Sequence, residues 1–346
     1  MKQLKTKIYI LLLFLLQLTY ASGSEALLPT TKNTTEEFVL SIHKQHTVNK
    51  AGNKLPDLTI DILAKPQLLT KFVEKPELVE AWKIISHRRI DLRTNTDALT
   101  SLNTLLNNSK LARKLPGKTS IEIENLLANM KGWSGASYKQ VCDKVNLLVD
   151  ELPANVTGLD KYLGSAGFGN GNVYTNRHSW VQLERLLENK EKLKIADEII
   201  FENPISFNGF NSVTDVYMRI GSDIYEIETK AGIKFFENVA SNSSNFAKQS
   251  YNSLNNVNKL ENYKVFLNPA VKDALGNTDK LNVINAWKNW EGGALLENLS
   301  IREKFTEFAR NELNNPTLGV FENGEQLRTF LNSNDNWFKK IFIENL

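Results

Sequence analysis

Cysteine is almost absent from this chain, since Cys142 is the only one among 346 residues. A single cysteine cannot form an intramolecular disulfide, and it excludes a zinc site built from cysteine ligands. The fold must therefore be held together by burial of apolar side chains. At this length, 41% hydrophobic residues supply a sizeable core, and two folded regions are expected rather than one.

Two common kinds of binding motif are also missing. His43, His46 and His87 lack the spacing to carboxylates that metal ligation needs, so we interpret them as surface histidines. The glycine-rich stretch 164–171 follows no apolar strand and precedes no Lys-Ser/Thr pair, which argues against a nucleotide-binding loop. We interpret this stretch as a junction between two parts of the chain.

An excess of charge of one sign is lacking as well. The chain has 42 basic and 39 acidic residues, a formal charge of +3, and three of its lysines precede residue 8. Loss of those three by cleavage would leave 39 against 39, so a nucleic-acid-binding surface would have to be local. The candidate basic side chains for such a surface are Lys230, Lys234, Lys248, Lys264 and Arg185.

The start of the chain has the pattern of an export signal. Lysines precede the apolar run Ile8–Leu16, and small residues around Ala21 and Gly23 offer a cleavage site. The run is short for a membrane span, and no cysteine is placed to accept a lipid. We expect residues 1–22 to be a signal peptide and the mature protein to be secreted, without stable membrane association after cleavage.

Composition and periodicity divide the remainder into three parts. Residues 23–56 are polar and predict a spacer. Apolar residues recur at helical spacing in 57–155, which predicts helices near 77–82, 97–106, 121–130 and 138–152. Residues 156–346 mix strand and helix patterns, so we expect an α/β (α+β) domain with a small mixed sheet flanked by helices. The apolar tail around Trp337 is expected to pack on its core, although it would also suit a partner.

The most informative pattern is a predicted hairpin. Strands are predicted at 213–220 and 224–231, joined by the tight turn Gly221-Ser222-Asp223. Because side chains alternate along a strand, Glu226, Glu228 and Lys230 share one face of the second strand. Pairing of the two strands would place Asp215 beside Glu228.

Two carboxylates and a lysine at this spacing indicate phosphodiester chemistry. Adjacent carboxylates repel each other unless a cation offsets their charge, and Mg²⁺ (or Mn²⁺) prefers oxygen ligands. Such a metal polarises a phosphoryl oxygen and acidifies a bound water, while a lysine orients that water or offsets the charge at phosphorus. Asp215, Glu228 and Lys230 therefore predict a metal-dependent endonuclease. The alternative is a secreted, non-catalytic binding module whose hairpin charges are structural.

The Asp215 and Glu228-Thr229-Lys230 pattern resembles the PD-(D/E)xK nuclease superfamily over about residues 180–269. Members share a restriction-endonuclease-like αβββαβ core, and the resemblance implies that fold here. A helix opened by a capping box at Ser179, a strand at 197–202, the hairpin, a helix within 235–260 and a strand at 263–267 are predicted in this order. Thr214 stands where the family pattern has proline.

The same resemblance implies further site residues. Gln249 matches a glutamine often found near the site in this superfamily, and the backbone carbonyl of Thr229 would join Asp215 and Glu228 as a metal ligand. A glutamate on the first helix often helps to hold the metal, and Glu184 is the best placed there, although a solvated glutamate is its alternative. His178, in Asn176-Arg177-His178, offers a different design with a histidine base, which we rank lower because no second metal-ligand histidine follows.

A second resemblance lies in the helical region. Residues 75–82 and 92–95, followed by a leucine-rich helix, resemble the segment before C-terminal toxin domains in bacterial polymorphic toxins of the Bacteroidetes type. With the export signal and the nuclease motif, it implies a secreted antibacterial toxin whose substrate is DNA or RNA. A cognate immunity protein is the further partner that this resemblance implies.

Overall fold

The computed structural model describes residues 52, 54–65, 67–87, 89, 92–130, 135–164, 173–232, 234–241 and 243–346. The predicted signal peptide, most of the predicted spacer and most of the glycine-rich stretch lie outside the described residues. The chain divides into two compact units, one up to Glu77 and one from Leu78 to Leu346. Within the described part of the chain, every helix is too short or too polar to cross a membrane.

The first unit contributes two short helices, α3 (Leu58–Ala64) and α4 (Gln67–Glu74). The second unit begins with the four predicted helices, each within a few residues of its expected place: α5 (Leu78–Ile85), α6 (Thr96–Leu106), α8 (Ser120–Ala128) and α9 (Gly135–Glu151). A further short helix, α7 (Leu111–Lys114), was not predicted. Local caps explain the starts of α6 and α8. Asn95 accepts a hydrogen bond from the amide of Ala98, and Thr119 and Glu122 form a capping box. Cys142 is buried in α9, where burial raises the pKa of its thiol to about 12.

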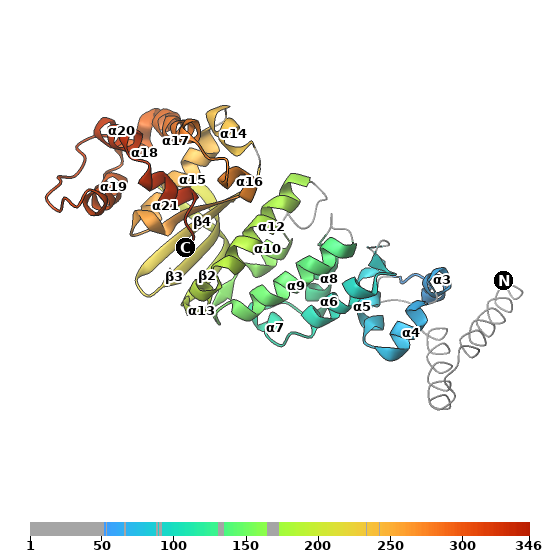
Figure 1. Cartoon of the computed structure of the whole chain (residues 1–346). Helices are drawn as coiled ribbons and strands as arrows, with labels where there is room; N and C mark the ends of the chain where they lie inside the picture. The colour runs from blue at the N-terminus through green and yellow to red at the C-terminus, as the bar shows by residue number, and fades with distance from the viewer. Residues whose placement is uncertain are drawn as a thin grey trace, which may run out of the picture. The chain divides into compact units, whose positions relative to one another are not determined.

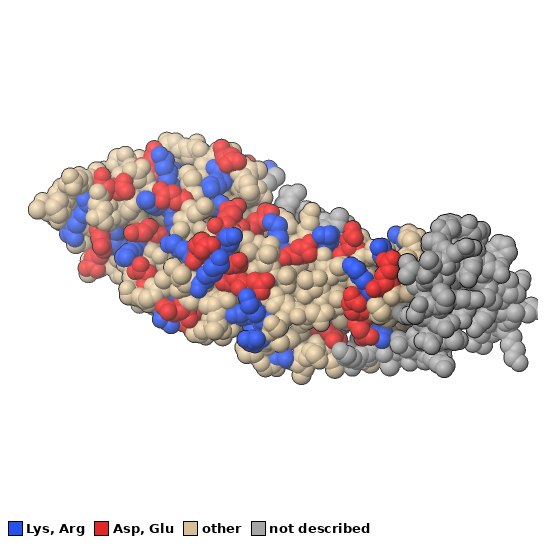
Figure 2. Space-filling model, turned by 60° about the horizontal axis from the view of Figure 1, so that its bottom comes forward, with Lys and Arg blue, Asp and Glu red and all other residues tan. Residues whose placement is uncertain are grey.

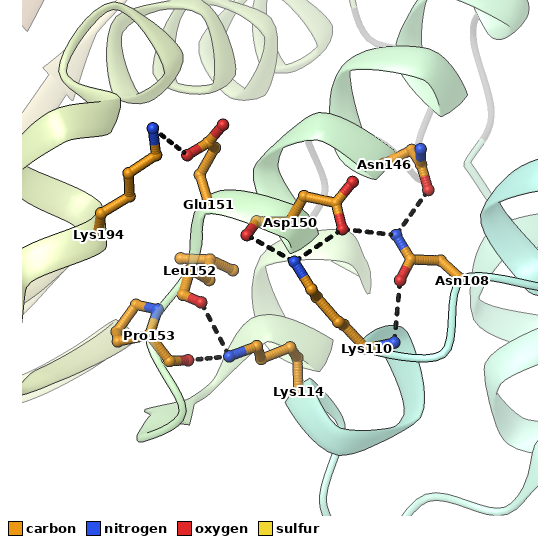
Figure 3. Close-up of polar contacts among 9 residues, drawn as sticks. All are labelled: Asn108, Lys110, Lys114, Asn146, Asp150, Glu151, Leu152, Pro153 and Lys194. Carbon is orange, nitrogen blue, oxygen red and sulfur yellow. Dashed lines mark hydrogen bonds and ion pairs between the residues drawn. The ribbon is translucent and has the colours of Figure 1, made fainter.

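Polar contacts connect these helices to the sheet region that follows (Figure 3). The ammonium of Lys114 donates to the carbonyls of Leu152, at 2.9 Å, and Pro153, just after the end of α9. Burial lowers the pKa of Lys114, with the nearby charges of Lys110 and Arg113 adding to the effect. Lys194 of α13 (Lys190–Ile195) pairs with Glu151 at 3.2 Å. The compact unit that starts at Leu78 therefore includes the sheet and the part of the predicted helical region from Leu78 onward, while residues 57–77 of that region belong to the first unit.

A five-stranded mixed sheet forms the centre of the second unit, which is the α/β fold expected from the sequence. Its strands follow chain order: β1 (Val156–Thr157), β2 (Glu198–Phe207), β3 (Phe210–Ile220), β4 (Asp223–Lys230) and β5 (Tyr263–Leu267). The central strands β2, β3 and β4 are antiparallel, while β1 and β5 run parallel to their neighbours. Gly158, with φ +72°, follows β1, and a Cβ there would meet the carbonyl of Phe201 at 2.1 Å.

Helices cover both faces of this sheet (Figure 1). α10 (Leu159–Gly164) and α12 (Val173–Glu188) lie on one face, where the Tyr162 ring stacks on Phe201 at 5.0 Å and the Arg185 guanidinium lies 5.3 Å from the Phe266 ring. α15 (Ser243–Asn256) lies on the other face, preceded by α14 (Phe235–Ser241). The observed order α12, β2, β3, β4, α15, β5 is the predicted helix, three strands, helix, strand. The predicted capping box at Ser179 is wrong, because α12 begins six residues earlier and buries Ser179 in its interior.

The part of the chain from Pro269 onward is helical and contains much of the aromatic core. Its elements are α16 (Pro269–Lys272), α17 (Asn277–Asn289), α18 (Ala294–Glu297), α19 (Leu299–Glu312), α20 (Gly324–Ser333) and α21 (Asn336–Phe342). The indole of Trp337 lies 5.4 Å from that of Trp287 and 6.2 Å from the Phe305 ring, measured between centroids. The apolar tail is thus buried within the chain, as expected.

Candidate active site

The candidate site lies where β3 and β4 separate. The β3–β4 pairing ends at Val216 and Ile227, and the register of β2 with β3 passes from Phe201–Val216 to Asn203–Thr214. Asp215 therefore stands at a break in both ladders. Its Oδ2 atom accepts a hydrogen bond from the backbone amide of Thr229 at 2.5 Å. This bond connects β3 to β4 just beyond their last pair, Val216–Ile227, at the point of separation that we call the fork.

The lysine of the motif connects the fork to the helix above it. Lys230 Nζ donates to Glu228 Oε2 at 3.1 Å and to Oε1 of Gln249, on α15, at 3.0 Å. Four residues predicted from the sequence, together with the Thr229 backbone, thus form one group of contacts between β3, β4 and α15. Because α15 also bonds Glu226 through Asn256, the charged face of β4 is the face that α15 covers.

Glu228 is the most deeply buried carboxylate of this group, with 0% of its side chain exposed. Burial raises the pKa of Glu228 to about 8; the charge of Lys230 opposes this shift, and the charge of Asp215 adds to it. Its Oε1 atom has no hydrogen-bond partner among the described residues. A buried carboxylate oxygen without a partner is costly, and a bound cation would offset that cost.

Helix α12 supplies a histidine that the sequence analysis ranked low. His178 Nε2 lies 3.4 Å from Asp215 Oδ2, and one turn later Gln182 Nε2 donates to the Asp215 carbonyl at 3.5 Å. Burial raises the pKa of Asp215, but the hydrogen bond and charge of His178, then Lys230 and the Thr229 amide, hold it below its ordinary value. Burial lowers the pKa of His178, yet Asp215 outweighs this effect and the net shift is upward.

Glu184 is not brought to this site. Its carboxylate pairs with Lys144 of α9 at 3.1 Å. Residues two apart on a helix point in nearly opposite directions, so Glu184 lies on the face of α12 opposite Gln182. The expected metal-holding role of a glutamate on this helix therefore has no support at Glu184.

The candidate basic side chains are also scattered. Arg185 is buried and pairs with Glu188 at 2.6 Å, and Lys264 is buried and donates to the Lys340 carbonyl at 2.7 Å. Burial lowers the pKa of Lys264 to about 8. On the face drawn in Figure 2, basic and acidic side chains are interspersed over the described surface. Lys230 contacts the site, whereas Arg185 and Lys264 are engaged elsewhere.

The donor set fits a hard divalent cation, because the Asp215 carboxylate and the unpartnered Glu228 Oε1 both offer oxygen. Groups of three or more histidine, cysteine, aspartate or glutamate side chains placed to hold a metal ion are absent from the described residues. A cation here would therefore need backbone or water oxygens in addition to the two carboxylates. Comparison of the chain with protein-family models, curated proteins and solved structures gave no match.

Proposed function

We propose that this protein is a secreted nuclease that hydrolyses phosphodiester bonds of DNA or RNA with the help of Mg²⁺ or Mn²⁺. The observation that supports the proposal best is the group of contacts at the strand fork. Asp215 bonds the Thr229 amide, and Lys230 bonds both Glu228 and Gln249. These are the residue types, in the chain order, that the resemblance to PD-(D/E)xK nucleases implies.

Asp215 and Glu228 would hold the cation, with the backbone carbonyl of Thr229 as a further ligand. When bound, the cation would polarise a phosphoryl oxygen and acidify a coordinated water. The unpartnered Oε1 atom of buried Glu228 supports this role, because the carboxylate keeps a lone pair free for a ligand. Repulsion between the two carboxylates would fall once the cation is in place.

The chain's own residues supply the remaining chemistry. In hydrolysis a water oxygen bonds to phosphorus, the ester P–O bond breaks, the water loses a proton and the leaving oxygen gains one. The Lys230 ammonium is held between Glu228 and Gln249, so it can orient the water and offset negative charge on phosphorus. His178, beside Asp215, is placed to carry a proton.

The biological setting that we propose is antibacterial. The export signal at the start of the chain, the helical segment similar to those before polymorphic-toxin domains and the nuclease motif fit one role, a toxin delivered to competitors. A producer of such a toxin needs a cognate immunity protein. That partner, like secretion itself, is part of the proposal.

The direct test incubates the full chain with supercoiled plasmid and with total RNA, in Mg²⁺, in Mn²⁺ and in excess chelator. We expect divalent-dependent cleavage, and a loss of at least about 10²-fold in Asp215→Asn and Lys230→Met. Glu184→Gln is the matched control, because its carboxylate pairs with Lys144 away from the fork, and it should cleave like the native chain.

Circular dichroism would verify that each variant is folded. Cleavage that persists in chelator, or in both Asp215→Asn and Lys230→Met, would contradict the proposal. A folded native chain that cleaves neither nucleic acid would favour the secreted binding module instead.

A further inference from the structure

The backbone of Glu202 is unusual for a residue inside a strand. Its φ is +50°, in the left-handed region that side chains other than glycine rarely adopt. Among the described residues, the other non-glycine positions with positive φ are Asn208, Glu291 and Asn314. Asparagine tolerates this region in turns, and Glu291 lies at the kink before α18. Glu202 differs from all three because it stands in the middle of β2.

The position of Glu202 in the sheet is equally specific. The β2–β3 register runs Phe201–Val216 and then Asn203–Thr214, so Glu202 lies opposite Asp215. The left-handed backbone of Glu202 in β2 and the interrupted pairing at Asp215 in β3 thus occur at the same point of the sheet. It occurs at the start of the fork, where Asp215 turns toward Thr229 and His178.

The charge of Glu202 is coupled to the same two residues. Burial raises the pKa of Glu202, the negative charge of Asp215 raises it further, and the charges of His178 and Lys161 oppose the shift. In turn, the charge of Glu202 raises the pKa of His178. The Glu202 carboxyl therefore lies close enough to the Asp215–His178 pair for their charges to interact.

A glycine would adopt this backbone conformation without steric cost, and asparagine or aspartate would do so more easily than glutamate. A glutamate at this φ lowers the stability of the folded chain, and a purely structural role would be filled better by glycine or asparagine. Backbone strain of this kind concentrates at functional sites, where the surrounding structure enforces it. The irregularity therefore points to a use for the side chain.

We propose that Glu202 is a positioning residue, whose carboxylate acts with that of Asp215 to hold the His178 imidazole beside the fork. Its effect on turnover rests on the proposed nuclease function, whereas its effect on the placement of His178 does not. Glu202 is outside the acidic-x-lysine motif and would be a fourth strand side chain of the site, after those of Asp215, Glu228 and Lys230.

The test compares Glu202→Gln, which removes the charge, with Glu202→Gly, which removes the charge and relieves the backbone. Glu198→Gln is the matched control, because Glu198 lies on the same strand and pairs with Arg219 at 3.5 Å. Three quantities are measured for each variant: the thermal unfolding midpoint, the nuclease kcat and KM, and the imidazole ¹H–¹³C cross peaks. With 4 histidines in the chain, a His178→Asn variant assigns the relevant peak.

We expect Glu202→Gly to unfold about 2 °C higher than the native chain, because glycine tolerates the left-handed backbone. We also expect kcat to fall about tenfold in both Glu202 variants with little change in KM, as for loss of a residue that orients a catalytic group. The His178 cross peaks should move in both Glu202 variants and stay in place in Glu198→Gln. A gain in stability together with a loss of turnover would not arise from a purely structural role.

Unmoved His178 peaks in Glu202→Gln would overturn the proposal, whatever the activity. Native kcat in Glu202→Gly would overturn the positioning role, and a lower unfolding midpoint in that variant would remove the strain argument. If the native chain proves not to be a nuclease, the peak shifts and the unfolding midpoints still decide whether Glu202 holds His178. The two failures are therefore distinguishable.

Discussion

The two faces of strand β4 are equally buried but chemically opposite. On the face toward α12, Ile227 is 0% exposed and is flanked by Tyr225 and Thr229, which are also buried. On the face toward α15, Glu226 and Glu228 are likewise 0% exposed. Burial of the first face stabilises the fold through the hydrophobic effect. Burial of carboxylates on the second face costs free energy unless partners offset it. Full burial of its side chains is therefore not enough to distinguish a structural face of a strand from a functional one.

The partners on the charged face come from a single helix. α15 places Gln249 against Lys230 and Asn256 against Glu226, and Ser250 bonds the Tyr263 hydroxyl at 3.1 Å. The Lys230 ammonium pairs with Glu228, whereas Glu226 is bonded by the Asn256 amide. The residues of the charged face should therefore depend on one another, whereas those of the apolar face should act separately.

The largest effect is expected from removing the ammonium. Lys230→Met leaves Glu228 buried without its cation. At pH 9, above the pKa of about 8 that Glu228 has in the folded chain, loss of one partner of such a pair typically costs about 4 kcal/mol of unfolding free energy. The double variant Lys230→Met with Glu228→Gln should recover most of that loss, because neither group is then charged. Urea unfolding with chelator present measures both, with exposed Lys234→Met as the control. Equal instability of the single and double variants would show that Glu228 is not the partner that matters.

A smaller, pH-dependent effect is expected at Glu226. Burial raises the pKa of Glu226 to about 7, although hydrogen bonds from Asn256 and Thr214 oppose the shift. The folded chain then holds a proton that the unfolded chain releases near pH 4.5, so stability falls as the pH rises from there through 7. Glu226→Gln should be more stable than the native chain at pH 8, by up to about 3 kcal/mol, and similar to it at pH 4. Urea unfolding of both chains at pH 4 and pH 8, with chelator present, measures the difference in unfolding free energy. A pH-independent difference would contradict the assigned titration.

The smallest effect is expected on the apolar face. Ile227→Val removes one buried methylene and should cost about 1 kcal/mol, equally at pH 4 and pH 8. Because the Ile227 side chain lies on the opposite face of β4 from that of Glu226, its effect should add to that of Glu226→Gln in a double-mutant cycle. Strong non-additivity would mean that the two faces of β4 are not independent.

Local signals were sufficient to predict the α/β fold class and the order of its main elements. Alternating side chains and the Gly221–Ser222 turn defined the hairpin, and the order of strands and helices placed Asp215 beside Glu228 and Lys230. Each of these signals lies within a few residues of the structure that it determines. The contact of Lys230 with Gln249 depended on the resemblance, because a polar residue on a helix does not indicate what it faces.

Tertiary contacts determine the residues that local signals could not reveal. α12 is buried on several sides, with Gln182 and Arg185 as buried as Leu183 and Leu186, so no apolar stripe indicates which side faces the fork. Glu184 was predicted because it flanks the apolar stripe of Trp180, Leu183 and Leu187, whereas His178 and Gln182 face the fork. The role that we propose for Glu202 rests on its positive φ and its place opposite Asp215, whereas its sequence neighbours predict an ordinary strand.

The solitary thiol in α9 has a practical consequence for studying this molecule. Cys142 is fully buried, and burial raises its pKa to about 12, so maleimide reagents will not label it while the chain stays folded. A cysteine introduced at the exposed hairpin turn, as in Ser222→Cys, would thus be the one reactive sulfhydryl of the described residues. A fluorophore or spin label attached there could report motions of the hairpin without prior replacement of Cys142.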